Sequence, residues 1–329
     1  MQTAIVITSI YPPTEAVEKF SAMSDYDLVV VGDEKTPANW HCKNTRFIAV
    51  DHPESNQFAL NSVLPFNHYG RKMLGYLFSI QAGAQAIVDT DDDNIPGDDW
   101  SFPAFYGSFD LVENEGFVNI YQLFTDDHIW PRGLPLNMIN SREPIIIRKK
   151  TAVKIGIWQG LADEDPDVDA IYRLTNNKPC YFRKREPVLL SNKTIVPFNS
   201  QNTIVRKELF ALLYLPAYVT FRFTDILRGL VAQPIMWLYG YHLGFVEATV
   251  IQKRNPHDFY KDFISEIPMY QHVEAVIEIV KGAISADKNI SENLYNAYRA
   301  LKDQNIVEER ELVALCAWLK DLEDLKING

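Results

Sequence analysis

The feature that most constrains this chain is an apolar helix and a short apolar strand that run directly into a cluster of aspartates. Between residues 70 and 81 the apolar side chains recur at helical spacing, and Gly83 stands where such a helix would end. Ala86-Ile87-Val88 then indicates a buried strand, and Asp89-Thr90-Asp91-Asp92-Asp93 follows it without a break. Carboxylates crowded at a strand end repel one another unless a cation or a shift in pKa relieves them.

A divalent metal is the natural counter-charge for this cluster. Carboxylate oxygens suit Mg²⁺ or Mn²⁺, which keep coordination positions for water and for substrate phosphates. The pattern therefore predicts a nucleotide-sugar site in which the metal stabilises the leaving diphosphate. Asp91 is the expected metal ligand, Asp89 is expected to face the metal or the donor ribose, and Asp93 is the alternative ligand.

Three other interpretations of the acidic run compete. An EF-hand calcium loop counted from Asp89 requires Gly and Glu where the chain has Asn94 and Trp100. A phosphatase of the haloacid dehalogenase type usually has its Asp-x-Asp motif near the N-terminus, with Thr two residues later, and here Asp93 occupies that place. The third is a solvated acidic loop without a function. The buried-strand sequence directly before the run makes this interpretation less favoured.

Composition excludes some classes of function. A length of 329 residues, 47% hydrophobic and 23% charged, suits one large soluble domain or a core domain with an appendage. A net charge of -11 argues against a general nucleic-acid binder, because a phosphate backbone requires a basic surface. Cys42, Cys180 and Cys316 match no disulfide or zinc pattern, which favours a reducing compartment.

Neither an export signal nor a membrane span is predicted. The N-terminus leads straight into the strand-like Ala4-Ile5-Val6-Ile7, and the longest uncharged stretch, 229–246, is interrupted by polar residues and Pro234. We therefore expect a protein of the cytoplasm, or one peripheral to the inner face of a membrane.

The first half of the chain alternates strands and helices. Strands are expected at 4–10, 28–31, 46–50 and 86–88, and helices at 14–23 and 70–81. This order predicts an α/β fold with a mostly parallel, Rossmann-like sheet whose ligands lie at the carboxyl ends of the strands. The expected donor-binding residues at these ends, and at the start of the following helix, are Thr8, Asp33, Lys35, Arg71 and Lys72. An ordinary solvated helix start is the alternative for Arg71 and Lys72.

The rest of the chain supplies further candidates. Arg132, in the rigid turn 130–135, either holds a phosphate or sugar or pins its loop to a carboxylate. Asp167 follows Pro166 at a helix start, where a carboxylate is also an ordinary residue. From residue 204 the chain is expected to be largely helical, with Arg228 as another cation for the donor diphosphate. We expect a catalytic domain at 1–255 and a helical C-terminal region at 256–329 packed on it.

Several separated motifs, in the same order, resemble those of the STELLO-type glycosyltransferase family. They are residues 70–94, Thr36-Pro37, residues 130–135, residues 159–175 and Gln201-Asn202-Thr203, and the resemblance covers roughly residues 1–260. It implies a glycosyltransferase A fold, in which the donor lies across the strand ends and an Asp-x-Asp motif holds a divalent metal. Asp89 and Asp91 match the two acids of that motif. Plant STELLO proteins are Golgi membrane proteins with further domains, so we do not carry over their compartment or cell-wall partners.

A second motif concerns the acceptor side. Asp167-Val168-Asp169-Ala170-Ile171-Tyr172-Arg173 is similar to the segment that supplies the general base in many inverting enzymes of this fold. The resemblance implies that Asp167 is the base, with Asp169 as a second candidate that more plausibly pairs with Arg173. The plant UDP-arabinopyranose mutases carry a similar segment. The expected acceptor-binding residues are Arg132, Gln201 and Asn202.

The combined hypothesis is a metal-dependent glycosyltransferase. It would move a sugar from a nucleotide-sugar donor, with a UDP-sugar favoured, to a carbohydrate or glycan acceptor in polysaccharide or glycoconjugate synthesis. Its expected partners include a membrane surface or a synthase complex, and no nucleic acid. Two alternatives stay open: a sugar nucleotide mutase or nucleotidyltransferase, and a non-catalytic protein that binds nucleotide sugars or a partner.

Overall fold

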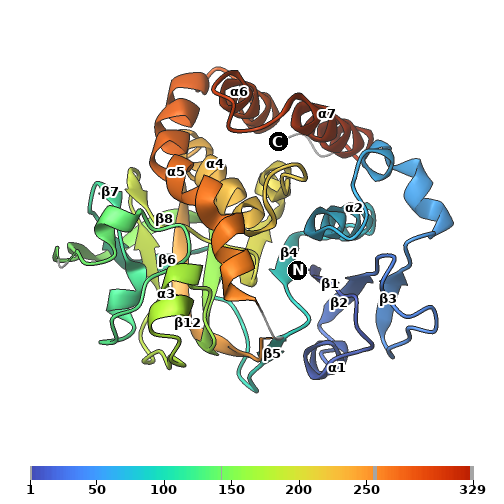
Figure 1. Cartoon of the computed structure of the whole chain (residues 1–329), viewed down its shortest axis with the longest axis horizontal. Helices are drawn as coiled ribbons and strands as arrows, with labels where there is room; N and C mark the ends of the chain where they lie inside the picture. The colour runs from blue at the N-terminus through green and yellow to red at the C-terminus, as the bar shows by residue number, and fades with distance from the viewer. Residues whose placement is uncertain (1, 142, 255–257, 327–329) are drawn as a thin grey trace.

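A ten-stranded mixed sheet forms the centre of the computed structural model, which describes residues 2–141, 143–254 and 258–326 (Figure 1). Its strands, in spatial order, are β3 (Thr45–Ile48), β2 (Tyr26–Val31), β1 (Thr3–Thr8), β4 (Ala86–Thr90), β11 (Asn202–Arg206), β8 (Ile147–Glu164), β6 (Tyr106–Val112), β9 (Val188–Leu190), β12 (Tyr241–Gln252) and β5 (Asn94–Pro96). A small second sheet pairs β10 (Thr194–Ile195) with β7 (Gly116–Phe117).

The expected α/β fold is confirmed, and its parallel part is the N-terminal half. β3, β2, β1 and β4 run parallel, with Thr3 opposite both Tyr26 and Ala86. β11 then lies antiparallel to both β4 and β8, while β12 runs parallel to β8. Residues 202–206 and 241–252 therefore form strands, and the expectation of a largely helical chain from residue 204 is wrong for both segments.

Helices cover both faces of the parallel half. α2 (Lys72–Gln81) packs on β1 and β2, and α1 (Glu15–Ser21) lies on the other face. Gly75 permits the close approach of α2, because a Cβ atom there would lie 2.5 Å from Cγ1 of Val6 and 2.8 Å from Cγ2 of Val31. The short helices are α3 (Ala170–Thr175), η1 (Pro53–Gln57), η2 (Ala59–Ser62), η3 (Tyr69–Arg71), η4 (Ile120–Leu123), η5 (Leu136–Met138), η6 (Lys207–Leu213) and η7 (Phe221–Phe223).

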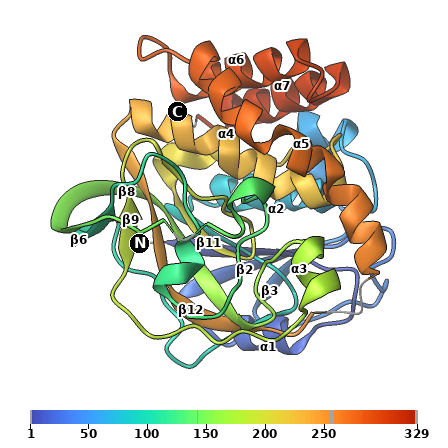
Figure 2. The same cartoon turned by 60° about the vertical axis from the view of Figure 1, so that its left-hand side comes forward.

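The C-terminal helices form one further layer over the side of the sheet that carries α2. They are α5 (Phe259–Ala283), α6 (Ile290–Asp303) and α7 (Glu309–Asp324), and they pack against α4 (Thr224–Leu238), η6 and η2 (Figures 1 and 2). No helix in the described ranges is both long and apolar enough to cross a membrane.

Two buried carboxylates of α7 attach this layer to the rest of the chain. Asp321 accepts hydrogen bonds of 2.8 Å from the backbone N–H groups of Ala59 and Leu60. Glu311 accepts from the N–H groups of Ala217 (3.0 Å) and Tyr218 (2.7 Å). Backbone donors that would otherwise be buried without a partner are satisfied in this way. We propose that the C-terminal region and the sheet domain unfold as one unit.

Replacing Glu311 with alanine should destabilise the whole molecule. The change leaves the N–H groups of Ala217 and Tyr218 and the Tyr214 hydroxyl without their acceptor, at a cost of about 3 kcal/mol. Denaturant unfolding followed by tryptophan fluorescence measures this cost. Glu309 lies on the same helix as Glu311, and Glu309→Ala, which removes only an exposed ion pair with Lys302 of α6, should cost less than about 0.5 kcal/mol. Equal losses in the two variants would contradict the assignment.

Candidate functional site

The first aspartate of the acidic run lies beneath the site. Asp89 is on β4, fully buried, and faces α2 and α4. Its carboxylate is 2.7 Å from Nζ of Lys72 and 2.6 Å from Nη1 of Arg228, and both cations are also buried. Burial opposes the charge of Lys72, but Asp89 and Asp91 outweigh burial and raise the pKa of Lys72. Asp89, Lys72 and Arg228 line neither of the two cavities described below, so this geometry favours supporting roles for these expected donor-binding residues.

The three following aspartates alternate between two adjoining cavities. Asp92 lines the first cavity, whereas Asp91 and Asp93 line the second. Residues 91–93 form a turn, in which the N–H of Asn94 donates to the carbonyl of Asp91 (3.3 Å), and this turn directs neighbouring side chains to different sides. The acidic run therefore forms part of the wall between the two cavities.

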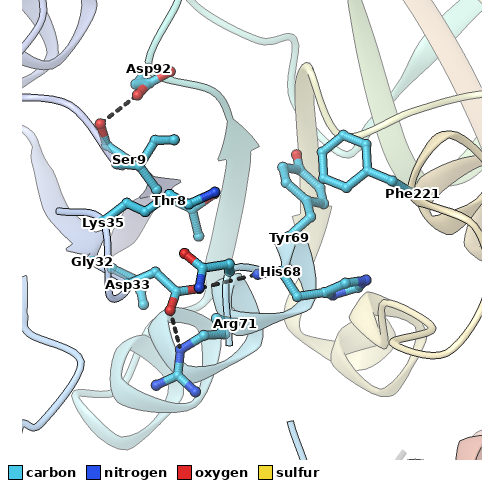
Figure 3. Close-up of a pocket in the computed structure, with 13 residues that line it drawn as sticks. Thr8, Ser9, Gly32, Asp33, Lys35, His68, Tyr69, Arg71, Asp92 and Phe221 are labelled. Atoms are coloured by element: carbon cyan, nitrogen blue, oxygen red, sulfur yellow. Dashed lines mark hydrogen bonds and ion pairs between the residues drawn. The ribbon is translucent and has the colours of Figure 1, made fainter. Parts of the chain in front are cut away.

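The first cavity lies at the carboxyl ends of β1 and β2 (Figure 3). It has a volume of about 210 Å³, and four of the expected donor-binding residues line it: Thr8, Asp33, Lys35 and Arg71. The Asp33 carboxylate accepts hydrogen bonds from the N–H groups of Glu34 (2.8 Å) and His68 (3.2 Å) and lies 3.8 Å from Nε of Arg71. On the opposite wall, Figure 3 shows the rings of Tyr69 and Phe221 side by side.

The second cavity is lined mainly by charged and amide side chains. Its volume is about 180 Å³, and its lining residues are Tyr69, Asp91, Asp93, Arg132, Asp167, Asn199, Gln201, Phe221, Arg222, Asp225, Gln252 and Arg254. Nη2 of Arg132 lies 2.8 Å from both Asp167 and Asp225. Of the two alternatives for Arg132, this geometry fits the pinning of its loop to carboxylates.

Asp167 is held in an ionised state. Its oxygens accept hydrogen bonds from Nε and Nη2 of Arg132 and from the amide of Asn199, each 2.8 Å long. Burial alone would raise its pKa, but Arg132 and Arg222 outweigh burial and hold the pKa of Asp167 well below its ordinary value. The same contacts make this carboxylate a weak base, so its predicted role as general base depends on the charge that develops at the acceptor during transfer.

Asp169 lies outside both cavities. It is the N-cap of α3, with its oxygens accepting from the N–H of Tyr172 (2.9 Å) and from Nε1 of Trp130 (2.8 Å). The expected side-chain pair between Asp169 and Arg173 is wrong, because the Arg173 guanidinium pairs with Asp165 and donates to the Pro166 carbonyl. The position of Asp169 fits a structural role.

The two amides expected to bind the acceptor are separated by the alternation of β11. Gln201 lines the second cavity and hydrogen-bonds to Gln252. Asn202 points away and is hydrogen-bonded to Nε1 of Trp100 (3.2 Å) and to the Thr249 hydroxyl (2.8 Å). Gln201 is therefore available to a ligand, and Asn202 connects strands.

A divalent cation fits Asp91 and Asp93 better than Asp89. The Asp91 side chain is 28% exposed, and its Oδ1 accepts from the Tyr69 hydroxyl (2.7 Å) and Lys72 (2.8 Å). Burial, and after it the neighbouring carboxylate of Asp91, raise the pKa of Asp93 to about 7, and a cation between the two carboxylates would relieve both effects. The described ranges contain no group of three or more ligating side chains, but Mg²⁺ is often held by one or two carboxylates together with substrate phosphates.

Sequence reasoning missed several residues of the site. Tyr69 and Phe221 line both cavities, and Asp225, Gln252 and Arg254 line the second. Tyr69 immediately precedes the apolar helix expected at 70–81. Asp225 could have been noticed as an acidic residue in the first turn of α4. No local pattern distinguishes Phe221 from a core phenylalanine.

The chain is similar to the STELLO glycosyltransferases. A family model described by that name matches residues 222–328. Two Arabidopsis thaliana proteins, "Probable glycosyltransferase STELLO1" and "Probable glycosyltransferase STELLO2", are 28% and 27% identical over 341 aligned residues. These alignments cover 97% of this chain and 44% of each relative, so the chain spans less than half the length of the relatives it matches. The resemblance in the sequence motifs is thereby confirmed.

Solved structures align more loosely. A glucosyl-3-phosphoglycerate synthase from Mycobacterium tuberculosis, in complex with Mn²⁺ and uridine-diphosphate-glucose, is 11% identical with a TM-score of 0.38, covering 86% of this chain and 80% of its own. A mycobacterial protein is 10% identical with a TM-score of 0.39, covering 86% of this chain and 76% of its own. Alignments at this level are compatible with many unrelated functions.

The titration of Asp169 should appear in the stability of the protein. Burial raises its pKa to about 6, from an ordinary value of 3.8, so its favourable contribution is complete below pH 3.8 and is lost as the pH rises through 6. The wild type should therefore lose stability as the pH rises from 4 to 8, and Asp169→Asn should not. The difference in unfolding free energy between the two proteins should change in favour of the variant by on the order of 2 kcal/mol. Denaturant unfolding of both proteins across that range measures the difference. A difference that does not change with pH would contradict this account.

Proposed function

We propose that this chain, which is similar to the STELLO glycosyltransferases, is a metal-dependent glycosyltransferase of the glycosyltransferase A type that uses a nucleoside-diphosphate-sugar donor. The observation that supports this most is the alternation of three aspartates between two adjoining cavities at the ends of the sheet strands. One cavity can hold a nucleoside and the other a sugar with its acceptor, and the diphosphate would cross between them at Asp91 and Asp92. Ligands of open α/β sheets bind at this edge.

The first cavity fits the nucleoside end of the donor. It combines the apolar Ile10 and Val31 with the carboxylate of Asp33, a common acceptor for ribose or base hydrogen-bond donors. Lys35 and Arg71 add positive charge toward the phosphates, and the N-terminal end of the segment η3–α2 is favourable for anions.

Asp91 and Asp93 are the residues that would hold Mn²⁺ or Mg²⁺. When bound, the metal neutralises the diphosphate as it leaves. Tyr69 and Lys72 fix the orientation of Asp91, because both donate hydrogen bonds to its Oδ1, and the Asp91 side chain lines the second cavity. The buried pair of Lys72 and Asp89 in turn holds Lys72 in place.

The second cavity fits an acceptor that carries hydroxyl groups. Asn199, Gln201 and Gln252 present amides, which can both donate to and accept from a hydroxyl. We propose that Asp167 accepts the proton of the attacking hydroxyl in an inverting reaction, with Arg132 fixing the direction of its oxygens. The amide groups of this cavity would also suit the hydroxyls of an external acceptor, which a transferase needs and a mutase does not.

Incubation with a panel of nucleotide sugars and Mn²⁺ tests the function. Slow hydrolysis of one donor to sugar and nucleoside diphosphate supports a transferase, since water replaces a missing acceptor. An isomerised donor would instead indicate a mutase, and binding without turnover a non-catalytic protein.

Asp91→Asn should uncouple the donor from the metal. The change keeps the size of the side chain but removes its charge, so donor affinity should no longer respond to Mn²⁺, and hydrolysis should slow by about two orders of magnitude. Calorimetric titration of the donor with and without Mn²⁺ measures the first effect. The exposed Asp99→Asn serves as the matched control and should behave as the wild type. Full turnover of Asp91→Asn with an unchanged metal response would transfer the proposed role to Asp93.

Asp167→Asn should stop transfer while donor binding persists. If Asp167 is the base, only the transition state uses its charge, so kcat should fall by about three orders of magnitude with little change in donor Kd. Steady-state kinetics and donor titration of the same preparation separate the two quantities, and its melting curve shows whether the variant is folded. Equal losses of donor affinity and rate would place Asp167 among binding residues and favour a retaining mechanism without this base.

A further inference from the structure

Phe221 is an exposed aromatic ring at the junction of the two cavities. It belongs to η7, its exposed fraction is 55%, and it lines both cavities together with Tyr69. The ring centroids of Phe221 and Tyr69 are 6.0 Å apart, with an angle of 73° between the ring planes. Single exposed apolar side chains are common on protein surfaces, so what distinguishes Phe221 is its place in the lining of both cavities.

The other side chains around the second cavity are polar. Its lining includes two aromatic rings, and the other ten residues are charged or carry amides. Tyr69 is fixed, since its hydroxyl is bonded to Asp91 and Lys72. A pyranose ring has the complementary shape, with hydroxyls around its edge and a face of C–H groups. Phe221 offers this face a flat apolar surface, and the amides and carboxylates opposite can bind the hydroxyls.

The charge balance of this cavity disfavours a sugar that carries its own carboxylate. Its three arginines are already paired, Arg132 with Asp167 and Asp225, Arg222 with Glu266 at 2.9 Å, and Arg254 with Asp165 at 3.1 Å. A uronic acid would therefore have to break one of these pairs to gain a counter-charge, because a cation held at Asp91 and Asp93 is already matched by those carboxylates and the diphosphate.

We propose that the second cavity binds the donor sugar as a neutral pyranose whose C–H face lies on Phe221, an inference that rests on the proposed function. A diphosphate at Asp91 would place the sugar beside the Phe221 ring, because Tyr69 contacts both residues: its hydroxyl donates to Asp91 and its ring lies next to Phe221. Phe221 is then a residue that determines which sugar is accepted, and we assign its main contact to the sugar although the ring also lines the first cavity.

Calorimetric titrations with matched ligands test this in the full chain with Mn²⁺. The ligands are UDP, UDP-glucose and UDP-glucuronate, or GDP, GDP-mannose and GDP-mannuronate if the protein prefers guanine. The unmodified protein should bind the neutral sugar nucleotide more tightly than the uronate. Phe221→Ala should weaken binding of the neutral sugar nucleotide by about tenfold and leave binding of the free diphosphate within about twofold. Phe221→Tyr, which keeps the ring, should restore most of the affinity.

The controls separate this inference from its premise. Tyr181→Ala removes another exposed aromatic ring, one that lines neither cavity, and should bind all ligands as the wild type does. Three outcomes would overturn the inference while leaving a nucleotide-sugar site in place. In Phe221→Ala, these are equal losses of affinity for the diphosphate and the sugar nucleotide, or no loss for either. In the unmodified protein, it is tighter binding of the uronate than of the neutral sugar nucleotide. An unmodified protein that binds none of these ligands would overturn the proposed function itself. The melting temperature of each variant confirms that it is folded.

Discussion

The buried contacts of Asp89 are the interaction on which the rest of the site depends. A carboxylate with no exposed surface is held between a lysine from the first turn of α2 and an arginine from α4. The carboxylate of Asp89 thus connects strand β4 to two helices, α2 and α4. Such a cluster is weak evidence for stability, because the desolvation of three charged groups offsets much of their attraction. Its effect is geometric: Lys72 also contacts Asp91, so the orientation of this partly exposed aspartate follows from the buried one.

The elements that the sequence predicts well are those with a strong local pattern. The helix now seen at Lys72–Gln81 and the strand before the acidic run stand out by their apolar spacing. Their order predicts the edge of the sheet at which the two cavities lie. β12 is different. Residues 241–252 follow the apolar helix α4 after a turn of only two residues, Tyr239 and Gly240, so the apolar stretch appears continuous. Pairing with β8 decides that it is a strand, and such a long-range contact leaves no local signal.

The candidate site shows the same limit at the level of single side chains. Sequence order brings Thr8, Asp33, Arg71, Asp91 and Asp167 to one edge of the sheet, and all of them line a cavity. Which charges face each other there depends on the alternation of β4 and β11 and on side chains from distant helices. Those contacts place the following predicted residues inside the protein: Lys72, Asp89, Asp169, Asn202 and Arg228. Counting charges along the chain cannot separate a cation that binds a ligand from one that neutralises a buried acid.

The alternation of the acidic run has a consequence for how this segment can vary over evolution. Substitutions at Asp91, Asp92 or Asp93 alter one cavity at a time, because neighbouring side chains point into different cavities. The loss or gain of a single codon would rebuild the turn that directs these side chains, and so change the residues presented to the two cavities, while Asp89 keeps its place in β4. The segment should thus vary more readily in residue type than in length. A homologue with an altered residue count between β4 and β5 would be expected to have a reorganised site, even if every aspartate were retained.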